Sequence, residues 1–100
     1  MGYIYILRCG DGSYYVGSTR NLEHRVWQHS VGKGAKYTSK RLPVELVFAH
    51  EFANIAEAYA MEKRVQGWSR AKREALIEGR FNDLRRLSKK DFGSAPGRLE

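Results

Sequence analysis

The sequence predicts an α/β protein of the α+β type, with a small three-stranded antiparallel sheet flanked by helices. The expected order is β-β-α-β-α, with one or two further helices at the C-terminal end. Two tyrosine-rich segments flank a glycine-containing turn, a third strand-like segment follows later, and segments of helical periodicity come between and after them. Because the chain has 100 residues, we expect one domain over residues 1–90 and a flexible tail over residues 91–100.

The first two strands are expected to form a hairpin. Residues Tyr3 to Cys9 are rich in aromatic and β-branched side chains, and Ser13 to Ser18 return as the partner strand. The Asp11-Gly12 pair favours a tight turn, because glycine tolerates the positive φ that such turns require. Glycine weakens a strand interior unless a ligand or another backbone comes close, so the hairpin is either ordinary aromatic packing or a functional surface. Alternation places Tyr3, Tyr5 and Leu7 on one face of the first strand, and Ser13, Tyr15 and Gly17 on one face of the second.

The segment from Leu22 to His29 is expected to be an amphipathic helix, capped by Thr19 or Asn21. Arg25 and His29 lie in or beside its apolar stripe. An arginine that faces a core is costly unless it is paired or faces a cleft. The stripe therefore indicates either a functional cleft, or an arginine that extends to solvent beside a boundary histidine.

Residues 30 to 42 are expected to form an exposed loop, because they contain two glycines, four cations and no acidic residue. Glycines let the backbone approach a phosphate, and cations attract it. Tyr37 is a candidate for hydrogen bonding to a phosphate, for stacking on a base or for the active cleft. A solvated loop is the alternative. The candidate nucleic-acid-binding residues are Lys33, Lys36, Lys40 and Arg41.

The third strand is expected over Val44 to His50, and a second amphipathic helix over Ile55 to Trp68, begun by Asn54. Glu62 lies in the apolar stripe of this helix, where an unpaired carboxylate is costly. A metal ion or a salt bridge to an arginine would remove that cost, and the spacing favours neither. Two further helices are expected, one capped by Ser69 and running through Ile77, the other from Phe81 to Leu87.

Several ordered motifs together resemble one known family. Tyr3-Ile4-Tyr5 and Tyr15-Val16-Gly17, separated by a turn, resemble the two halves of the GIY-YIG signature. The chain resembles the small, stand-alone, single-domain branch of the GIY-YIG nuclease superfamily, the UPF0213-like proteins. Through Arg41-Leu42-Pro43 and the glutamate helix, it is also similar to the catalytic subunit of branched-DNA structure-specific endonucleases. The likeness covers roughly residues 3 to 70 and includes Gly17 to Leu22, Arg25, His29, Gly34 to Thr38 and Glu62.

Two positions depart from the family pattern. Tyr3 begins the first motif where the family name has a glycine, which is a common variation in this branch. Ser18 stands where excision-repair members carry a lysine after the glycine. No role of a lysine therefore transfers to this position.

The resemblance implies metal-dependent hydrolysis of DNA phosphodiester bonds, with Glu62 holding one Mg²⁺ or Mn²⁺ ion. It implies that Tyr5 takes the proton of the attacking water and that Arg25 neutralises the charge developing on the phosphate. The further site residues that it implies are Tyr15 and His29, which orient the phosphate or relay protons, Tyr37 beside them, and Gly17, which keeps the strand surface clear.

Two other functions stay open: a nucleic-acid-binding module with the same fold and little catalysis, and an adaptor that uses an exposed Trp27. A formal net charge of +7 favours an anionic partner. Cys9 is the only cysteine, which excludes an internal disulfide and favours a reducing cytoplasm, and no apolar run approaches a membrane span. We expect a cytoplasmic endonuclease of weak sequence specificity that acts on DNA, with branched and single-stranded DNA as candidates, in repair or recombination. An activating protein partner and the oligomeric state stay open.

Overall fold

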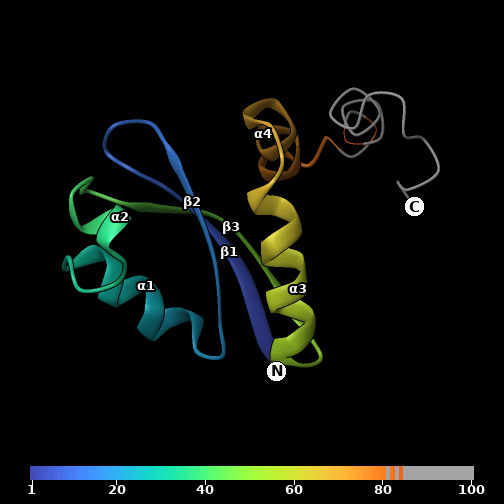
Figure 1. The fold of residues 1–100 in the computed structure, drawn as a ribbon, viewed down its shortest axis with the longest axis horizontal. Helices are drawn as coiled ribbons and strands as arrows, with labels where there is room; N and C mark the ends of the chain where they lie inside the picture. Colours follow the sequence, from blue (N-terminus) through green and yellow to red (C-terminus); the bar gives the residue numbers. More distant parts are fainter. Residues whose placement is uncertain (81, 83, 85–100) are drawn as a thin grey trace. The chain divides into compact units, whose positions relative to one another are not determined.

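A computed structural model describes residues 1–80, 82 and 84, and Figure 1 labels the elements in this part of the chain. The chain divides into two compact units, Met1–Gln66 and Gly67–Glu100. The first unit contains all of the elements below except α4. The elements are β1 (Gly2–Arg8), β2 (Tyr14–Thr19), α1 (Leu22–Ser30), α2 (Lys36–Ser39), β3 (Glu45–Phe52), α3 (Ile55–Gln66) and α4 (Arg70–Glu78).

The three strands form one antiparallel sheet in the order β2-β1-β3, so the predicted fold class is confirmed. The register of the hairpin places Tyr5 opposite Gly17 and Leu7 opposite Tyr15. The tight turn is also present: Gly12 has a φ of +86°, and its N–H donates to the carbonyl of Cys9 at 2.9 Å. Because β2 is an edge of the sheet, groups carried by β1 and β2 can meet groups from helices on either side of that edge.

The sheet is flanked on both sides, by α1 and α2 on one side and by α3 on the other (Figure 1). The central strand supplies much of the core, since Ile4, Ile6 and Leu7 are all at most 1% exposed. Helix α3 packs on β1 and β2 and contributes Ala58 and Val65, which are fully buried. Apolar burial of this kind is the main driving force that holds the elements together.

Asparagine side chains cap the N-termini of α1 and α3, the two helices that carry the candidate site. Asn21 caps α1, with its Oδ1 accepting from the His24 N–H at 3.0 Å, whereas Thr19 accepts from the Asn21 N–H at 3.1 Å. Asn54 caps α3 by accepting from the Glu57 N–H at 2.9 Å. Of the two predicted caps for α1, Asn21 is therefore the correct one.

The second unit contains α4, which begins at a Ser69 cap and ends at Gly79 in the left-handed region, with a φ of +75°. The predicted helix from Phe81 to Leu87 lies outside the described residues except for residues 82 and 84, and so does the predicted tail over residues 91–100. None of the helices in the described part of the chain is long and apolar enough to cross a membrane.

The prediction of an uninterrupted exposed loop over residues 30 to 42 is wrong, because residues Lys36–Ser39 form the short helix α2. The Ala35 carbonyl accepts from the Ser39 N–H at 3.0 Å and from the Thr38 hydroxyl at 3.1 Å. Thr38 is fully buried, and α2 packs against α1. A turn this short has no periodicity to detect, and its polar composition concealed a tertiary contact.

Candidate active site

Tyr5 and His29 form a buried pair between the sheet and α1. The Tyr5 hydroxyl and Nε2 of His29 are 2.9 Å apart, and the two side chains are 1% and 0% exposed. Nδ1 of the same imidazole lies 2.8 Å from Oγ1 of Thr38 in α2. His29 is therefore buried and bonded through both ring nitrogens, not a boundary residue.

Both members of the pair are neutral near pH 7. Burial raises the pKa of Tyr5 from 10.0 to about 12, and the charge of Glu62 contributes in the same direction, whereas the Arg25 guanidinium opposes the rise. Burial, followed by the positive charge of Arg25, lowers the pKa of His29 from 6.5 to about 4. The resting site thus holds a phenol beside an uncharged imidazole.

The depressed pKa of His29 predicts a loss of stability in mild acid. Between pH 6.5 and pH 4 the unfolded chain binds a proton at His29 that the folded chain does not, so stability is complete above pH 6.5 and decreases as the pH falls toward 4. We expect this residue to account for about 2–3 kcal/mol of that decrease. Urea unfolding at pH 7.5 and pH 4.5 measures it, and His29→Gln should show a smaller difference between the two pH values. An equal difference in both proteins would contradict the assignment.

Arg25 faces the pair from α1. Its guanidinium is half-buried, donates from Nη1 to the Gln28 amide oxygen at 3.0 Å, and lies close enough to Tyr5 to lower that residue's pKa by hydrogen bonding and by charge. The positive charge of Arg25 is therefore close enough to Tyr5 to act on it. This favours the cleft over an arginine that extends to solvent, and the functional role of Arg25 stays a prediction.

Aromatic rings connect the buried pair to the surface. The Tyr15 ring lies 5.1 Å from the His29 ring and 6.4 Å from the Tyr5 ring, measured between centroids. Tyr37 stacks on Tyr15 at 6.0 Å and is 37% exposed. The Arg41 guanidinium lies 3.8 Å from the centroid of the Tyr37 ring. Tyr15 thus forms a wall of the site, and Tyr37 lies at its rim.

Glycines make room for the two buried rings. A Cβ on Gly17 would overlap the hydroxyl of Tyr5, and a Cβ on Gly34 would overlap the imidazole of His29, both well inside van der Waals contact. Gly17 has an ordinary negative φ, so the reason for glycine there is close approach and not backbone conformation. This is the kind of close approach for which a glycine in a strand is expected.

Gly17→Ala should destabilise the protein by about 1–3 kcal/mol, although alanine normally stabilises a strand relative to glycine. The methyl group must displace the Tyr5 hydroxyl and with it the bond to His29. Urea unfolding measures the effect. The double variant Gly17→Ala/Tyr5→Phe is the control: it lacks the overlapping oxygen but keeps the ring carbon Cζ, which the methyl group also overlaps, so the added methyl group should cost less there without becoming neutral. Equal costs in both backgrounds would show that the strain comes from the ring and not from the hydroxyl.

Glu62 reaches the β2 edge from α3, on the other side of the sheet from α1. Its Oε1 accepts from the Ser18 hydroxyl at 2.5 Å, and its Oε2 accepts from the Gln66 amide at 2.7 Å. Lys63 Nζ lies 3.9 Å from Oε2, and the Glu62 side chain is 12% exposed. Among the ion pairs of the described residues, Glu62 is thus paired with a lysine and not with an arginine. Its charge is nevertheless close enough to raise the pKa of Tyr5.

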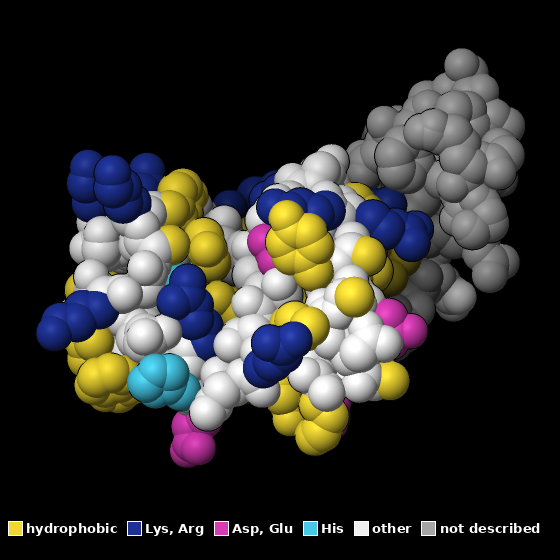
Figure 2. Space-filling model, turned by 60° about the horizontal axis from the view of Figure 1, so that its bottom comes forward, with side chains coloured by type: hydrophobic (Ala, Val, Ile, Leu, Met, Phe, Trp, Pro, Cys, Tyr) yellow, Lys and Arg dark blue, Asp and Glu magenta, His cyan; other side chains and the backbone are white. Residues whose placement is uncertain are grey.

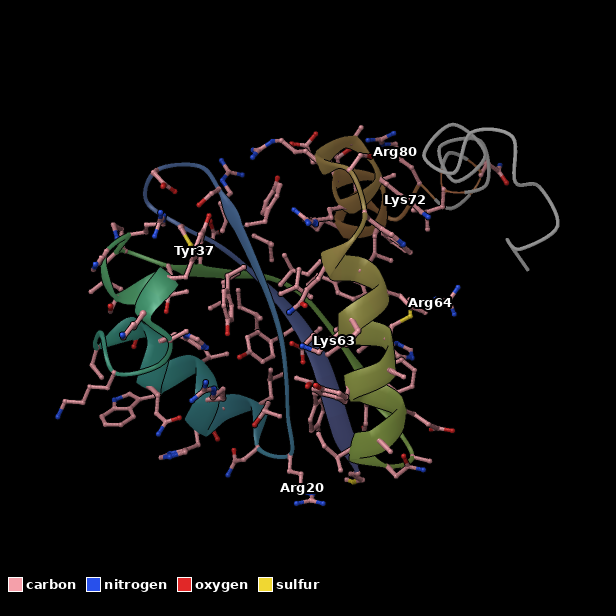
Figure 3. All side chains as sticks on the ribbon, viewed as in Figure 1. Arg20, Tyr37, Lys63, Arg64, Lys72 and Arg80 are labelled. Carbon is pink, nitrogen blue, oxygen red and sulfur yellow. The ribbon has the colours of Figure 1, made fainter. Side chains whose placement is uncertain are left out.

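The predicted nucleic-acid-binding cations differ in their availability. Lys33, Lys36 and Lys40 are exposed, whereas Arg41 is half-buried, with Nε 3.1 Å from Asp11 Oδ2 and Nη1 donating to the Tyr37 carbonyl at 2.9 Å. On the face that Figure 2 shows, Lys and Arg side chains are more widespread than Asp and Glu. Figure 3 shows that Lys63 extends from α3 on the side of the strands, whereas Arg64 extends from the other side of the helix.

Four contacting residues were not identified as site residues from the sequence. Gln66 could have been found, because it lies four residues after Glu62 and therefore on the same helical face. Ser18 faces α3 by strand alternation, but its significance depends on where α3 lies. Thr38 and Gly34 lie in a segment that shares the family resemblance, but no role was predicted for them because the segment was expected to be a loop.

Comparison with known proteins identifies the family. Residues 1–75 match the model of the GIY-YIG catalytic domain, a range that includes every candidate catalytic residue. The chain belongs to the GIY-YIG family. It is 47% identical over 76 residues to a UPF0213 protein of Bacillus pumilus, covering 76% of this chain and 78% of that protein. It is 49% identical over 76 residues to the UPF0213 protein OB0043 of Oceanobacillus iheyensis, with coverages of 76% and 88%.

A solved structure shares the fold. The solution NMR structure of the UPF0213 protein BH0048 from Bacillus halodurans is 44% identical, with a TM-score of 0.51, and the match covers 78% of this chain and 84% of that one. The resemblance to the GIY-YIG and UPF0213 proteins is therefore confirmed. The GIY-YIG domain implies a nuclease family with a DNA substrate, and GIY-YIG nucleases generally use divalent metal ions.

Proposed function

We propose that this GIY-YIG protein is an endonuclease that hydrolyses DNA phosphodiester bonds with the help of one Mg²⁺ or Mn²⁺ ion. The observation that supports this best is that Tyr5, which is hydrogen-bonded to His29, lies within electrostatic reach of both Arg25 and Glu62. The Tyr5–His29 pair offers a proton path, Arg25 offers a fixed positive charge, and Glu62 offers a carboxylate. Phosphodiester hydrolysis needs an activated water, charge relief at the phosphate and stabilisation of the leaving oxygen.

The surroundings of Glu62 fit a hard divalent cation. Each carboxylate oxygen accepts one strong hydrogen bond, from Ser18 or Gln66, and keeps a further lone pair. No group of three or more His, Cys, Asp or Glu that could hold a metal ion occurs in the described residues. One carboxylate completed by water and phosphate oxygens suits Mg²⁺, which keeps most of its waters. When bound, the ion would neutralise phosphate charge and lower the pKa of a coordinated water.

Tyr5 and His29 then supply the proton path. With pKa values of about 12 and about 4, neither a phenolate nor an imidazolium is favoured in the resting site. Transfer is therefore coupled: Tyr5 takes a proton from the attacking water while its own proton passes to His29 Nε2. The water oxygen bonds to phosphorus, the P–O bond to the leaving nucleotide breaks, and the leaving oxygen takes a proton from solvent.

Arg25 and Tyr15 hold the phosphate in this scheme. Gln28 orients the guanidinium through a 3.0 Å hydrogen bond, so that charge-assisted hydrogen bonds to phosphate oxygens cost little reorganisation. Tyr15 lies between the buried pair and Tyr37, with its ring centroid 6.4 Å from that of Tyr5 and 6.0 Å from that of Tyr37. Tyr37 contributes an exposed edge, where a nucleotide can contact it.

The DNA backbone is held by exposed cations on both sides of the site. Lys33, Lys36 and Lys40 lie in and near α2, and Lys63 lies beside Glu62 on α3. Lysine contacts to phosphates carry no sequence information, so we propose structure-directed or weak sequence specificity, with branched and single-stranded DNA as candidate substrates. We further propose a cytoplasmic role in DNA repair or recombination, and an activating protein partner as a candidate requirement.

The test is cleavage of labelled single-stranded, duplex and branched DNA by the purified protein with Mg²⁺, with Mn²⁺ and with a chelator. Glu62→Ala, purified identically, controls for contaminating nucleases. We expect metal-dependent cleavage by the wild type and none by the variant. Salt-sensitive DNA binding without cleavage would favour the alternative, a binding module with the same fold. If the protein neither cleaves DNA nor binds it in a salt-sensitive way, the result would favour the third function, an adaptor that contacts a protein through Trp27. This side chain is 55% exposed.

A further inference from the structure

Thr38 has no role in the scheme above, although its hydroxyl is one of the two partners of the buried imidazole. The hydroxyl oxygen is 2.8 Å from His29 Nδ1 and 3.1 Å from the Ala35 carbonyl oxygen. A hydroxyl carries a single proton, and a carbonyl oxygen can only accept. The placement of that proton therefore bears on which nitrogen of His29 is protonated.

Two arrangements of protons are consistent with the heavy atoms. In the first, Thr38 donates to the Ala35 carbonyl, Nδ1–H of His29 donates to Thr38, and the Tyr5 hydroxyl donates to Nε2. In the second, Thr38 donates to Nδ1, and Nε2–H donates to the Tyr5 oxygen. The two arrangements differ in the tautomer of His29 and in the direction of the Tyr5 hydrogen bond.

The first arrangement gives every buried proton an acceptor. In the second, the Tyr5 oxygen accepts the hydrogen bond from His29, and the phenol proton has no acceptor among the hydrogen bonds of the described residues. Tyr5 is 1% exposed, and an unsatisfied buried donor of this kind is unfavourable. The second arrangement also loses the bond from Thr38 to Ala35.

We propose that Thr38 is a positioning residue that holds His29 in the Nδ1–H tautomer, leaving the Nε2 lone pair directed at Tyr5. The placement is rigid: Thr38 is fully buried in α2, and the Gly34 backbone packs so closely against the imidazole that a Cβ would overlap Nδ1. The consequence for catalysis rests on the proposed function, because only the Nδ1–H tautomer can accept the phenol proton at Nε2. The proton then passes from Tyr5 to His29, giving an imidazolium whose Nδ1–H still donates to Thr38.

The test compares Thr38→Val, which keeps the shape but loses the hydroxyl, with Thr38→Ser, which keeps the hydroxyl. Nitrogen-15 NMR of labelled histidine in the intact chain reports which ring nitrogen of His29 is protonated, with or without nuclease activity. We expect a protonated Nδ1 in the wild type and in Thr38→Ser. In Thr38→Val we expect a shift toward Nε2–H, because Nδ1–H loses its acceptor.

Cleavage kinetics supply the second readout. Thr38→Val should lower kcat about 10- to 100-fold with little change in KM, and Thr38→Ser should restore most of it. A wild type protonated at Nε2 overturns the proposal, even if Thr38→Val does not fold. So does an unchanged tautomer in folded Thr38→Val. If the tautomer behaves as expected and no cleavage occurs under any condition, the nuclease proposal fails and the assignment of Thr38 stands as structural.

Discussion

Replacing Glu62 by alanine should reduce DNA cleavage by about 10³-fold or more, which corresponds to about 4 kcal/mol of transition-state stabilisation. Glu62 is the carboxylate whose charge helps to raise the pKa of Tyr5, and the described residues contain no group of three or more His, Cys, Asp or Glu that could hold a metal ion. Ser18 and Gln66 fix the side chain, so a shorter carboxylate is also expected to fail. Glu62→Asp should therefore lose most of the activity although it keeps the charge.

Measuring the DNA dissociation constant of Glu62→Ala separates an effect on catalysis from an effect on substrate affinity. Removing a negative charge beside a phosphate site should leave the dissociation constant unchanged or slightly lower at constant salt. Glu57→Gln is the matched control, because it removes an exposed carboxylate from the same helix, away from the site. If Glu62→Ala cleaves within tenfold of the wild type while Glu57→Gln behaves normally, the carboxylate of Glu62 does not hold the metal ion.

The sequence predicted the fold well, because its signals are local. Strand alternation, the Asp11-Gly12 turn and the asparagine caps each act over a few residues, and the observed strands and helices other than α2 fall within two residues of the predicted bounds. Helix α2 was missed because its four residues are too few for a periodic pattern. Its stability depends on packing against α1, which no local signal reports.

The sequence indicated which residues belong to the candidate site, but it gave much less information on which residues contact one another there. Arg25 and Glu62 attracted attention because a charge in an apolar stripe is costly, and both have polar partners in the structure. The partners themselves come from other elements: Ser18 meets Glu62 across 44 positions in the sequence, and Thr38 meets His29 through the missed helix. Pairing of this kind depends on the tertiary arrangement, so spacing alone left a metal ion and an arginine as equal alternatives for Glu62.

Replacing Tyr5 by phenylalanine should lower kcat for DNA cleavage by about 10²- to 10⁴-fold, the range typical of a lost general base. The ring stays, so the packing of β1 against α1 is kept and only the hydroxyl beside His29 and Arg25 is removed. KM should change little, because the phenol is buried and makes few contacts with DNA in the ground state. Stability should decrease by about 1–3 kcal/mol, since Nε2 of His29 is left buried without its partner.

Tyr3→Phe is the matched control for this variant. Tyr3 lies two residues earlier on the same strand and face, is half-buried, and should tolerate loss of its hydroxyl with cleavage unchanged. If kcat is measured at a temperature below the thermal unfolding of both variants, their difference in stability does not affect the comparison. If Tyr5→Phe keeps a third or more of wild-type kcat, the attacking water gives its proton to a group other than Tyr5. The buried Tyr5–His29 bond would then serve the fold rather than the reaction.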